Sequence, residues 1–215
     1  MKSLLVIAGP SAVGKTTVSD EILRQNTRFT LIRSATTRAP RGDGHDDEYI
    51  YFDETDFRRE IARGGMLEYT EYSGNLYGTL RSEILLAQRE GKIPLLILDL
   101  SGVASLRSSE YEKDTLFVYL YDKLDTLEER LYARYMTPPT EEGLTKFSKR
   151  KEQNIADYLA FRDKADMFDL IVSNATSPTD TANKIILAMS GTDAIVKDEV
   201  VASLYAMANA RKDKV

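Results

Sequence analysis

The chain contains no cysteine or tryptophan, and its only histidine is His45. Without cysteine it can build neither a disulfide framework nor a thiolate metal site, and a single histidine nearly excludes zinc sites and histidine-based triads. The apolar run at residues 4–8 is too short for a signal peptide or a membrane-spanning helix. The net charge of −5 creates no general attraction to nucleic acid or anionic membranes. We therefore expect a cytoplasmic protein that binds neither nucleic acid nor membrane.

The composition is that of a folded globular protein. Hydrophobic residues make up 42% and charged residues 29% of the 215 residues. A chain of this length can bury a substantial core as one large domain or as one domain with inserts. Lysines and arginines cluster locally, which favours small anionic ligands.

A short apolar strand leads directly into a loop with the pattern G-x-x-x-x-G-K-T at residues 9–16. Glycines let the backbone turn its N–H groups toward a phosphate, and the dipole of the helix that follows adds positive potential there. Lys15 is expected to reach the β- and γ-phosphates of ATP, and the Thr16 hydroxyl to bind Mg²⁺. The expected ATP-binding residues of this loop are Gly9, Pro10, Ser11, Ala12, Val13, Gly14, Lys15, Thr16 and Thr17.

Apolar runs and helical segments alternate along the chain. Consecutive apolar residues without polar alternation are typical of parallel strands covered on both faces. We expect such strands at residues 4–8, 94–100, 116–121 and 170–172. Helices are expected at residues 17–24, 55–63, 82–90, 124–135 and 145–165, with a loop at 136–143. The alternation predicts an α/β fold.

Two further motifs carry polar groups at fixed spacing. Residues 34–41 place Arg38 and Arg41 around a proline, and guanidinium groups bind phosphate oxygens in bidentate fashion. Residues 68–79 begin with Glu68 and end in Y-G-T. Taken singly, the arginines could be surface charges, Glu68 a helix-end carboxylate, and the last segment a simple turn.

Together with the phosphate loop, these motifs resemble the guanylate kinase family. Residues 34–41 are similar to that family's S-x-T-T-R-x-P-R stretch, and residues 68–79 to its E-x(5)-G-N-x-Y-G-[ST] stretch. The resemblance implies a P-loop NTPase three-layer α/β fold with a parallel central sheet. It also implies a core at 1–30 and 80–190, a GMP-binding insert at 31–79 and a lid at 132–151. Independently of the resemblance, we expect a C-terminal helical extension at 191–215.

The implied activity is phosphorylation of GMP, or of dGMP, by ATP with Mg²⁺, in purine nucleotide metabolism. The GMP phosphate would be held by Arg38, Arg41, Tyr49 and Tyr77, and the guanine read by Ser34, Glu68, Thr79 and Asp99. Asn174 matches a family position near the adenine of ATP. The expected catalytic residues are Lys15, Arg38, Arg130, Arg134 and Arg150.

The chemistry of guanine supports the role that the resemblance implies for Glu68. Guanine presents two donors, N1–H and the N2 amino group, which one carboxylate such as Glu68 can accept together. Adenine would present a lone pair to the same charge, and such a mismatch costs on the order of 1–3 kcal/mol. One glutamate at the right depth therefore suffices to prefer guanine over adenine.

The lid arginines have two interpretations. Arg130 and Arg134 lie four residues apart on one helical face, and Arg150, or alternatively Lys149, would follow the lid loop. These arginines could instead be an exposed helix face that pairs with neighbouring glutamates (Glu128, Glu129 and Glu152).

The sequence departs from the family at three points. Ile97 stands where the family has the first aspartate of a D-x-D pair, so turnover could be low. The acidic segment after Arg41 is one residue shorter than the family's, and the lid loop is longer and contains two prolines. Two alternatives therefore stay open: a guanylate-kinase-like nucleotide- or partner-binding module with weak or no catalysis, and a P-loop kinase of another small phosphorylated acceptor.

The tail beyond residue 190 lies outside the resemblance. Its apolar residues follow helical spacing, which fits either a terminal helix packed on its own core or a dimer contact, so the protein is expected to be a monomer or a homodimer.

Overall fold

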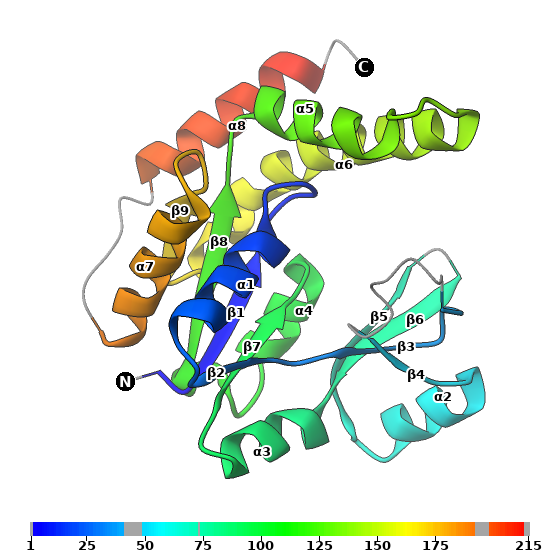
Figure 1. Ribbon diagram of the computed structural model, residues 1–215, viewed down its shortest axis with the longest axis vertical. Helices are drawn as coiled ribbons and strands as arrows, with labels where there is room; N and C mark the ends of the chain where they lie inside the picture. The colour runs from blue at the N-terminus through cyan, green and yellow to red at the C-terminus, as the bar shows by residue number, and fades with distance from the viewer. Residues whose placement is uncertain (1, 41–48, 73, 192–197, 213–215) are drawn as a thin grey trace.

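The computed structural model describes residues 2–40, 49–72, 74–191 and 198–212, and it contains two sheets (Figure 1). The larger sheet has the strand order β2-β7-β1-β8-β9, and every pairing in it is parallel. The strands are β1 (Leu4–Ala8), β2 (Phe29–Leu31), β7 (Ile93–Ile97), β8 (Thr115–Tyr121) and β9 (Leu170–Ser173). The expected parallel α/β sheet is confirmed.

Helices cover both faces of this sheet (Figure 1). The connection from β1 through α1 runs to β2, whereas the connection from β7 through α4 runs to β8, in the opposite direction along the sheet. Because such crossovers are right-handed, α1 and α4 lie on opposite faces of the sheet. The aromatic core shows the packing on the α6 face, where the Phe161 ring stacks on Tyr119 of β8 with 3.8 Å between centroids. The helices are α1 (Lys15–Gln25) and α7 (Pro178–Met189) on one face, and α4 (Leu100–Arg107) and α6 (Glu141–Phe161) on the other.

The smaller sheet has the order β4-β3-β6-β5 and stands beside the main sheet (Figure 1). Helix α2 (Glu54–Ala62) covers it and buries Phe57 completely in a small apolar cluster of its own. Helix α3 (Arg81–Arg89) returns the chain to β7. The strands are β3 (Ser34–Thr36), β4 (Tyr49–Tyr51), β5 (Met66–Tyr72) and β6 (Asn75–Leu80).

Two helices project above the smaller sheet (Figure 1). Helix α5 (Leu124–Tyr135) ends only five residues before α6, so the expected loop at 136–143 is shorter and α6 begins at Glu141 rather than at residue 145. The Thr140 side chain caps α6 by accepting from Gly143 N at 2.9 Å. A side chain at Gly143 would meet Tyr135 O, so a glycine here lets the start of α6 approach the end of α5.

The C-terminal helix α8 (Asp198–Lys212) packs on α6, and a few of its side chains reach α5 (Figure 1). Leu204 and Ala208 are fully buried in the main core. At the end of α8, the Arg211 guanidinium pairs with Glu128 and Asp125 of α5. The apolar face of this helix is thus used within the chain. No helix among the described ranges is long and apolar enough to cross a membrane.

Several boundaries differ from the sequence prediction. The strand expected at 94–100 ends at Ile97, because Asp99 caps a helix, α4, that the sequence analysis did not anticipate. Strand β2 and helix α7 were also missed. The helix expected to reach residue 165 ends at Phe161 and continues as a 3₁₀ turn, Arg162–Met167.

Candidate active site

The loop after β1 has the backbone conformation of a phosphate cradle. Gly9 and Gly14 have φ angles of +148° and +97°, in the range that favours glycine. A side chain at Gly9 would lie 2.4 Å from Leu120 O, and one at Gly14 would lie 2.5 Å from Asn174 Nδ2. Gly14 also precedes α1 without a side-chain cap, so the N–H groups of the first helical turn are available to an anion.

Lys15 lies within this loop. Its amino group donates to Gly9 O at 2.7 Å and to Pro10 O at 2.9 Å. The residue is partly exposed, yet its amino group is deeply surrounded by protein, and this burial lowers the pKa of Lys15 to about 8. A phosphate that entered the loop would offer the amino group an anionic partner in place of neutral carbonyls.

Three side chains hold the outer side of the loop. Asn154 of α6 bonds to both backbone groups of Ser11, and Arg130 of α5 donates to Ala12 O and Val13 O at 3.3 and 3.4 Å. The Asn174 amide donates to Val13 O at 2.8 Å. Three successive carbonyls therefore point away from the concave side, as a loop that presents N–H groups to phosphate requires.

Further charges surround Lys15. Arg130 pairs with the buried Asp122 at 3.0 Å, and the positive charges of Arg134 and Arg150 reach Lys15 and lower its pKa. Asp157 of α6 raises the pKa of Lys15, and burial raises the pKa of the Asp157 carboxyl itself.

Asn154 and Asp157 were not predicted from the sequence. Their spacing from Arg150, four and seven residues on, is the helical signal that could have found them.

A buried carboxylate lies at the junction of the two sheets. Glu68 of β5 is 8% exposed and accepts from the Thr79 hydroxyl of β6 at 2.7 Å. Burial raises the pKa of Glu68, the Thr79 bond opposes this shift, and the charge of Asp99 adds to it. Asp99 itself caps α4 by accepting from Gly102 N at 2.8 Å. The structure thus brings Glu68, Thr79 and Asp99 together.

A cationic and aromatic group lies on the smaller sheet. The Arg38 guanidinium lies 4.7 Å from the centre of the Tyr49 ring, and the Tyr77 ring meets Tyr49 edge-on at 6.4 Å. Tyr51, which the sequence analysis did not single out, hydrogen-bonds with Arg38. Arg38 Nε is buried without a hydrogen-bond partner among the described ranges. An anion is the group that would satisfy such a donor.

The remaining expected residues are distributed as follows. Ser34 pairs with Tyr49 across β3 and β4, so it lies on the same small sheet. Arg41 falls outside the described residues.

The other two residues lie on the side of the phosphate loop. Thr16 is exposed on the first turn of α1. Asn174 is buried, and its amide oxygen accepts from Thr181 Oγ1 at 2.9 Å. Its expected place near the adenine stays a prediction.

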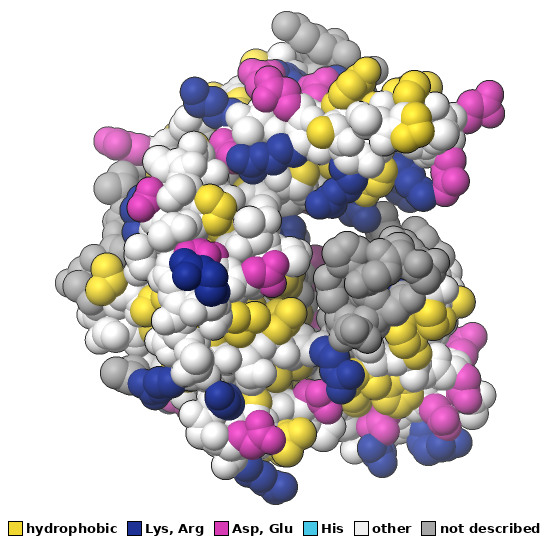
Figure 2. Space-filling view, viewed as in Figure 1, with side chains coloured by type: hydrophobic (Ala, Val, Ile, Leu, Met, Phe, Trp, Pro, Cys, Tyr) yellow, Lys and Arg dark blue, Asp and Glu magenta, His cyan; other side chains and the backbone are white. Residues whose placement is uncertain are grey.

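The two groups of residues face a common hollow. Figure 2 shows Lys and Arg side chains on the underside of the projecting helices, opposite the smaller sheet. In Figure 1 the loop after β1 and the helices α5 and α6, which carry Arg134 and Arg150, lie on one side, and the smaller sheet lies on the other. Such an arrangement can hold two anionic ligands end to end and bring their phosphates together.

The residues also fit a divalent cation held mainly by a nucleotide. No cluster of three or more acidic or histidine side chains suited to a metal occurs among the residues that the structure covers. Mg²⁺ needs no such cluster, since it keeps several waters and binds through few protein groups plus substrate phosphates. The exposed Thr16 hydroxyl beside Lys15 can supply such a contact.

The parallel sheet, its phosphate loop and the two flanking units define an α/β protein of the P-loop nucleotide-binding class. A family model described as guanylate kinase matches residues 1–187. The chain is 34% identical over 172 residues to a guanylate kinase of Sus scrofa, covering 79% of this chain and 83% of that protein. It is 33% identical to one of Trichormus variabilis, covering 80% and 81%. The chain belongs to the guanylate kinase family of enzymes.

The solved structures show the same fold. A crystal structure of guanylate kinase from Anaplasma phagocytophilum aligns with a TM-score of 0.64 at 20% identity, covering 88% of this chain and 85% of that one. The α8 helix lies beyond the region that the family model matches.

Proposed function

We propose that this protein transfers the γ-phosphoryl group of ATP to GMP, giving ADP and GDP. The observation that carries the proposal is the buried Glu68–Thr79 pair, whose carboxylate lies close enough to Asp99 for the two charges to interact. A phosphate loop alone fits many acceptors. A buried carboxylate that accepts hydrogen bonds is suited to a base with two adjacent donors, and guanine is such a base.

The acceptor phosphate would bind at Arg38. This guanidinium has an unpartnered buried Nε among the described residues, and Tyr49 and Tyr77 pack around it. Arg41 would add a second cation. Ser34, Thr79 and Asp99 would complete the contacts to the guanine beside Glu68.

The donor phosphates would bind in the loop of residues 9–17. Lys15 would exchange its two carbonyl partners for phosphate oxygens, and Arg134 and Arg150 would approach the transferring group from the lid. Mg²⁺ held by ATP and Thr16 would neutralise phosphate charge. A GMP phosphate is mostly dianionic at pH 7, so its oxygen can attack the γ-phosphorus in line without a general base, while the bond to ADP breaks.

The test is ADP release from Mg·ATP with GMP, dGMP, AMP, UMP or CMP, each against a reaction without acceptor. Turnover confined to GMP and dGMP supports the proposal. Turnover with AMP at a similar rate would remove Glu68 as the base reader. The ratio of the GMP and dGMP rates settles which of the two is preferred.

A nucleotide-binding module with little catalysis is less well supported than the kinase, and Ile97 is the one observation on its side. This residue ends β7, where it pairs with Ile7 and packs on the core, so it contributes no carboxylate beside the loop. Asp99 and Asp157 remain as the acids whose charges reach Lys15. Folded protein that binds GMP and ATP without turnover would identify this candidate.

The cytoplasmic location and the monomeric or homodimeric state remain predictions. Size-exclusion chromatography with light scattering would measure the second. The burial of Leu204 and Ala208 within the chain favours the monomer.

A further inference from the structure

One residue of the phosphate loop has a strained backbone. Ala12 has φ +64°, and it is the only non-glycine residue with a positive φ among those that the structure describes. In this conformation Cβ approaches the following carbonyl oxygen, a cost that glycine avoids. The strain persists only if surrounding contacts hold the loop in place.

The strongest such contact is made by Asn154, which bonds to Ser11, the residue just before Ala12. Its Oδ1 accepts from Ser11 N at 2.8 Å, and its Nδ2 donates to Ser11 O at 3.0 Å. The two bonds also fix the orientation of the amide, because the reverse orientation would oppose two donors and two acceptors. One side chain thus fixes both backbone groups of Ser11, so the orientation of the Ser11 backbone depends on the position of α6.

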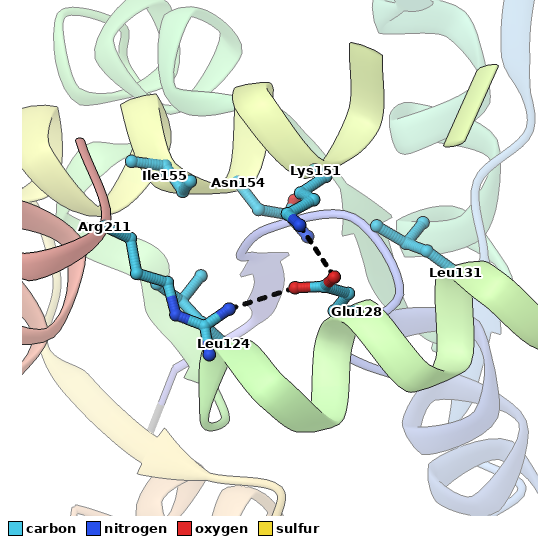
Figure 3. Close-up of a pocket in the computed structure, with 7 residues that line it drawn as sticks. All are labelled: Leu124, Glu128, Leu131, Lys151, Asn154, Ile155 and Arg211. Atoms are coloured by element: carbon cyan, nitrogen blue, oxygen red, sulfur yellow. Dashed lines mark hydrogen bonds and ion pairs between the residues drawn. The ribbon is translucent and has the colours of Figure 1, made fainter. Parts of the chain in front are cut away.

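The surroundings of Asn154 strengthen this contact. The residue is 2% exposed and lies on α6 at the edge of a pocket that apolar side chains line together with the ion pairs of Glu128 with Lys151 and Arg211 (Figure 3). Buried polar groups among apolar atoms cannot exchange their partners for water without cost. The amide is therefore held to Ser11, and Ser11 O is held toward α6.

We propose that Asn154 is a positioning residue for phosphoryl transfer: it holds the phosphate loop in its binding conformation against the strain at Ala12. It acts through the backbone of Ser11 and does not touch the nucleotide. Arg130 and Asn174 fix the next two carbonyls, but neither bonds to a loop N–H group. The proposal rests on the proposed use of this loop for ATP, and it extends that use to a residue of α6.

The experiment measures Mg·ATP binding by calorimetry and both KM values and kcat by steady-state assay, on the full chain. We expect Asn154→Ala to weaken ATP binding and raise the KM for ATP about tenfold, with the KM for GMP within twofold of the unsubstituted protein. The control is Glu152→Ala, an exposed residue on the opposite side of the same helical turn, which should change neither value. Unchanged ATP binding in folded Asn154→Ala protein would overturn the proposal.

A second variant tests the link to strain. Glycine adopts φ +64° at little cost, so Ala12→Gly in the Asn154→Ala background should restore at least half of the lost ATP affinity, on a logarithmic scale. Strictly additive effects of the two substitutions would refute the role assigned to Asn154. Where Asn154→Ala protein does not fold, Asn154→Gln, which keeps the amide but displaces it, is measured with the same two outcomes. Calorimetry reports on ATP alone, so a failure to phosphorylate GMP is distinguishable from a failure of this proposal.

Discussion

The Thr79 hydroxyl donates a 2.7 Å hydrogen bond to Oε1 of Glu68 from the directly opposite position of the neighbouring strand. The pairing holds the carboxylate in one orientation and leaves its other oxygen, Oε2, close to Gly102 at the start of α4. A side chain at Gly102 would crowd that oxygen at 3.3 Å. The site therefore combines an oriented acceptor with little spare volume beside it.

Replacing this carboxylate should separate function from stability. We expect Glu68→Gln to lower kcat/KM for GMP by about 10–100-fold, since a charge-assisted hydrogen bond is worth about 1.5–3 kcal/mol, and to leave the KM for ATP nearly unchanged. The control is Glu71→Gln, an exposed residue on the same strand. Equal losses for both substrates would place Glu68 outside the base pocket.

The same substitution should stabilise the protein at neutral pH. The folded protein raises the pKa of Glu68 above its ordinary value of 4.5, so the buried anion is less favourable than in the unfolded chain. This cost is absent below pH 4.5, grows as the pH rises from 4.5 to the folded pKa, and stays constant above it. Thermal unfolding of Glu68→Gln should thus show a higher Tm than the parent at pH 7, and a smaller difference at pH 4.

Arg38 should act on the acceptor alone. We expect Arg38→Ala to raise the KM for GMP by about tenfold or more, because it removes a charge-assisted phosphate contact, while ATP binding changes little. Arg58→Ala is the matched control, since Arg58 is an exposed arginine of the same subdomain that pairs with Glu54. Unchanged GMP kinetics in the Arg38 variant would reduce this residue to a structural partner of Tyr49.

Nucleotide binding should be coupled to proton uptake at Lys15. The pKa of about 8 in the free protein should rise when the amino group gains a phosphate partner. Between the two pKa values binding then takes up a proton, so uptake should be near zero at pH 7 and approach one proton per ATP near pH 9. Calorimetry in buffers of different ionisation enthalpy measures it.

Two variants check this assignment. Lys15→Ala should abolish the uptake together with phosphoryl transfer. Asp157→Asn removes the largest charge that raises the Lys15 pKa, and should move the window of uptake to lower pH. Uptake that persists in the Lys15 variant would assign the proton to another group.

Glu128 should stabilise the contact of α8 with α5 and α6. Its Oε1 accepts from Lys151 of α6 at 2.7 Å and its Oε2 from Arg211 of α8 at 3.0 Å (Figure 3). These groups are partly exposed, so we expect Glu128→Gln to cost about 1 kcal/mol, or about 2–4 °C in Tm. The exposed neighbour Glu129→Gln should leave Tm within 1 °C, given that exposed surface substitutions are worth at most about 0.5 kcal/mol.

The sequence predicted the parts of the fold whose signal is local. The uninterrupted apolar runs marked β1 and β8 almost to the residue, and the glycine pattern marked the phosphate loop. Strand β2 escaped because its three residues include Thr30 and carry no run of their own. Helix α4 escaped because the apolar run of β7 continues past the strand end, so Asp99 was interpreted as a strand residue rather than a helix cap.

The proximity of candidate-site residues was predictable where one motif contains them, as for Glu68 and Thr79. It was not predictable where the contact depends on how a distant helix packs. Asn154 lies 143 positions from Ser11, and no local pattern tells that its amide meets that backbone. Tyr51 likewise needed the small sheet to bring its side chain to Arg38.

The two ends of α6 contact different parts of the molecule. From Asn154 onward it is anchored, by Ser11, by the hydrogen bonds of Tyr158 with Asp122, and by the buried Phe161. Its first turns, from Glu141 on, project away from the core beside the end of α5. If the lid expected at residues 132–151 closes over bound nucleotides, the part of α6 from Asn154 onward would stay with the core and with the phosphate loop.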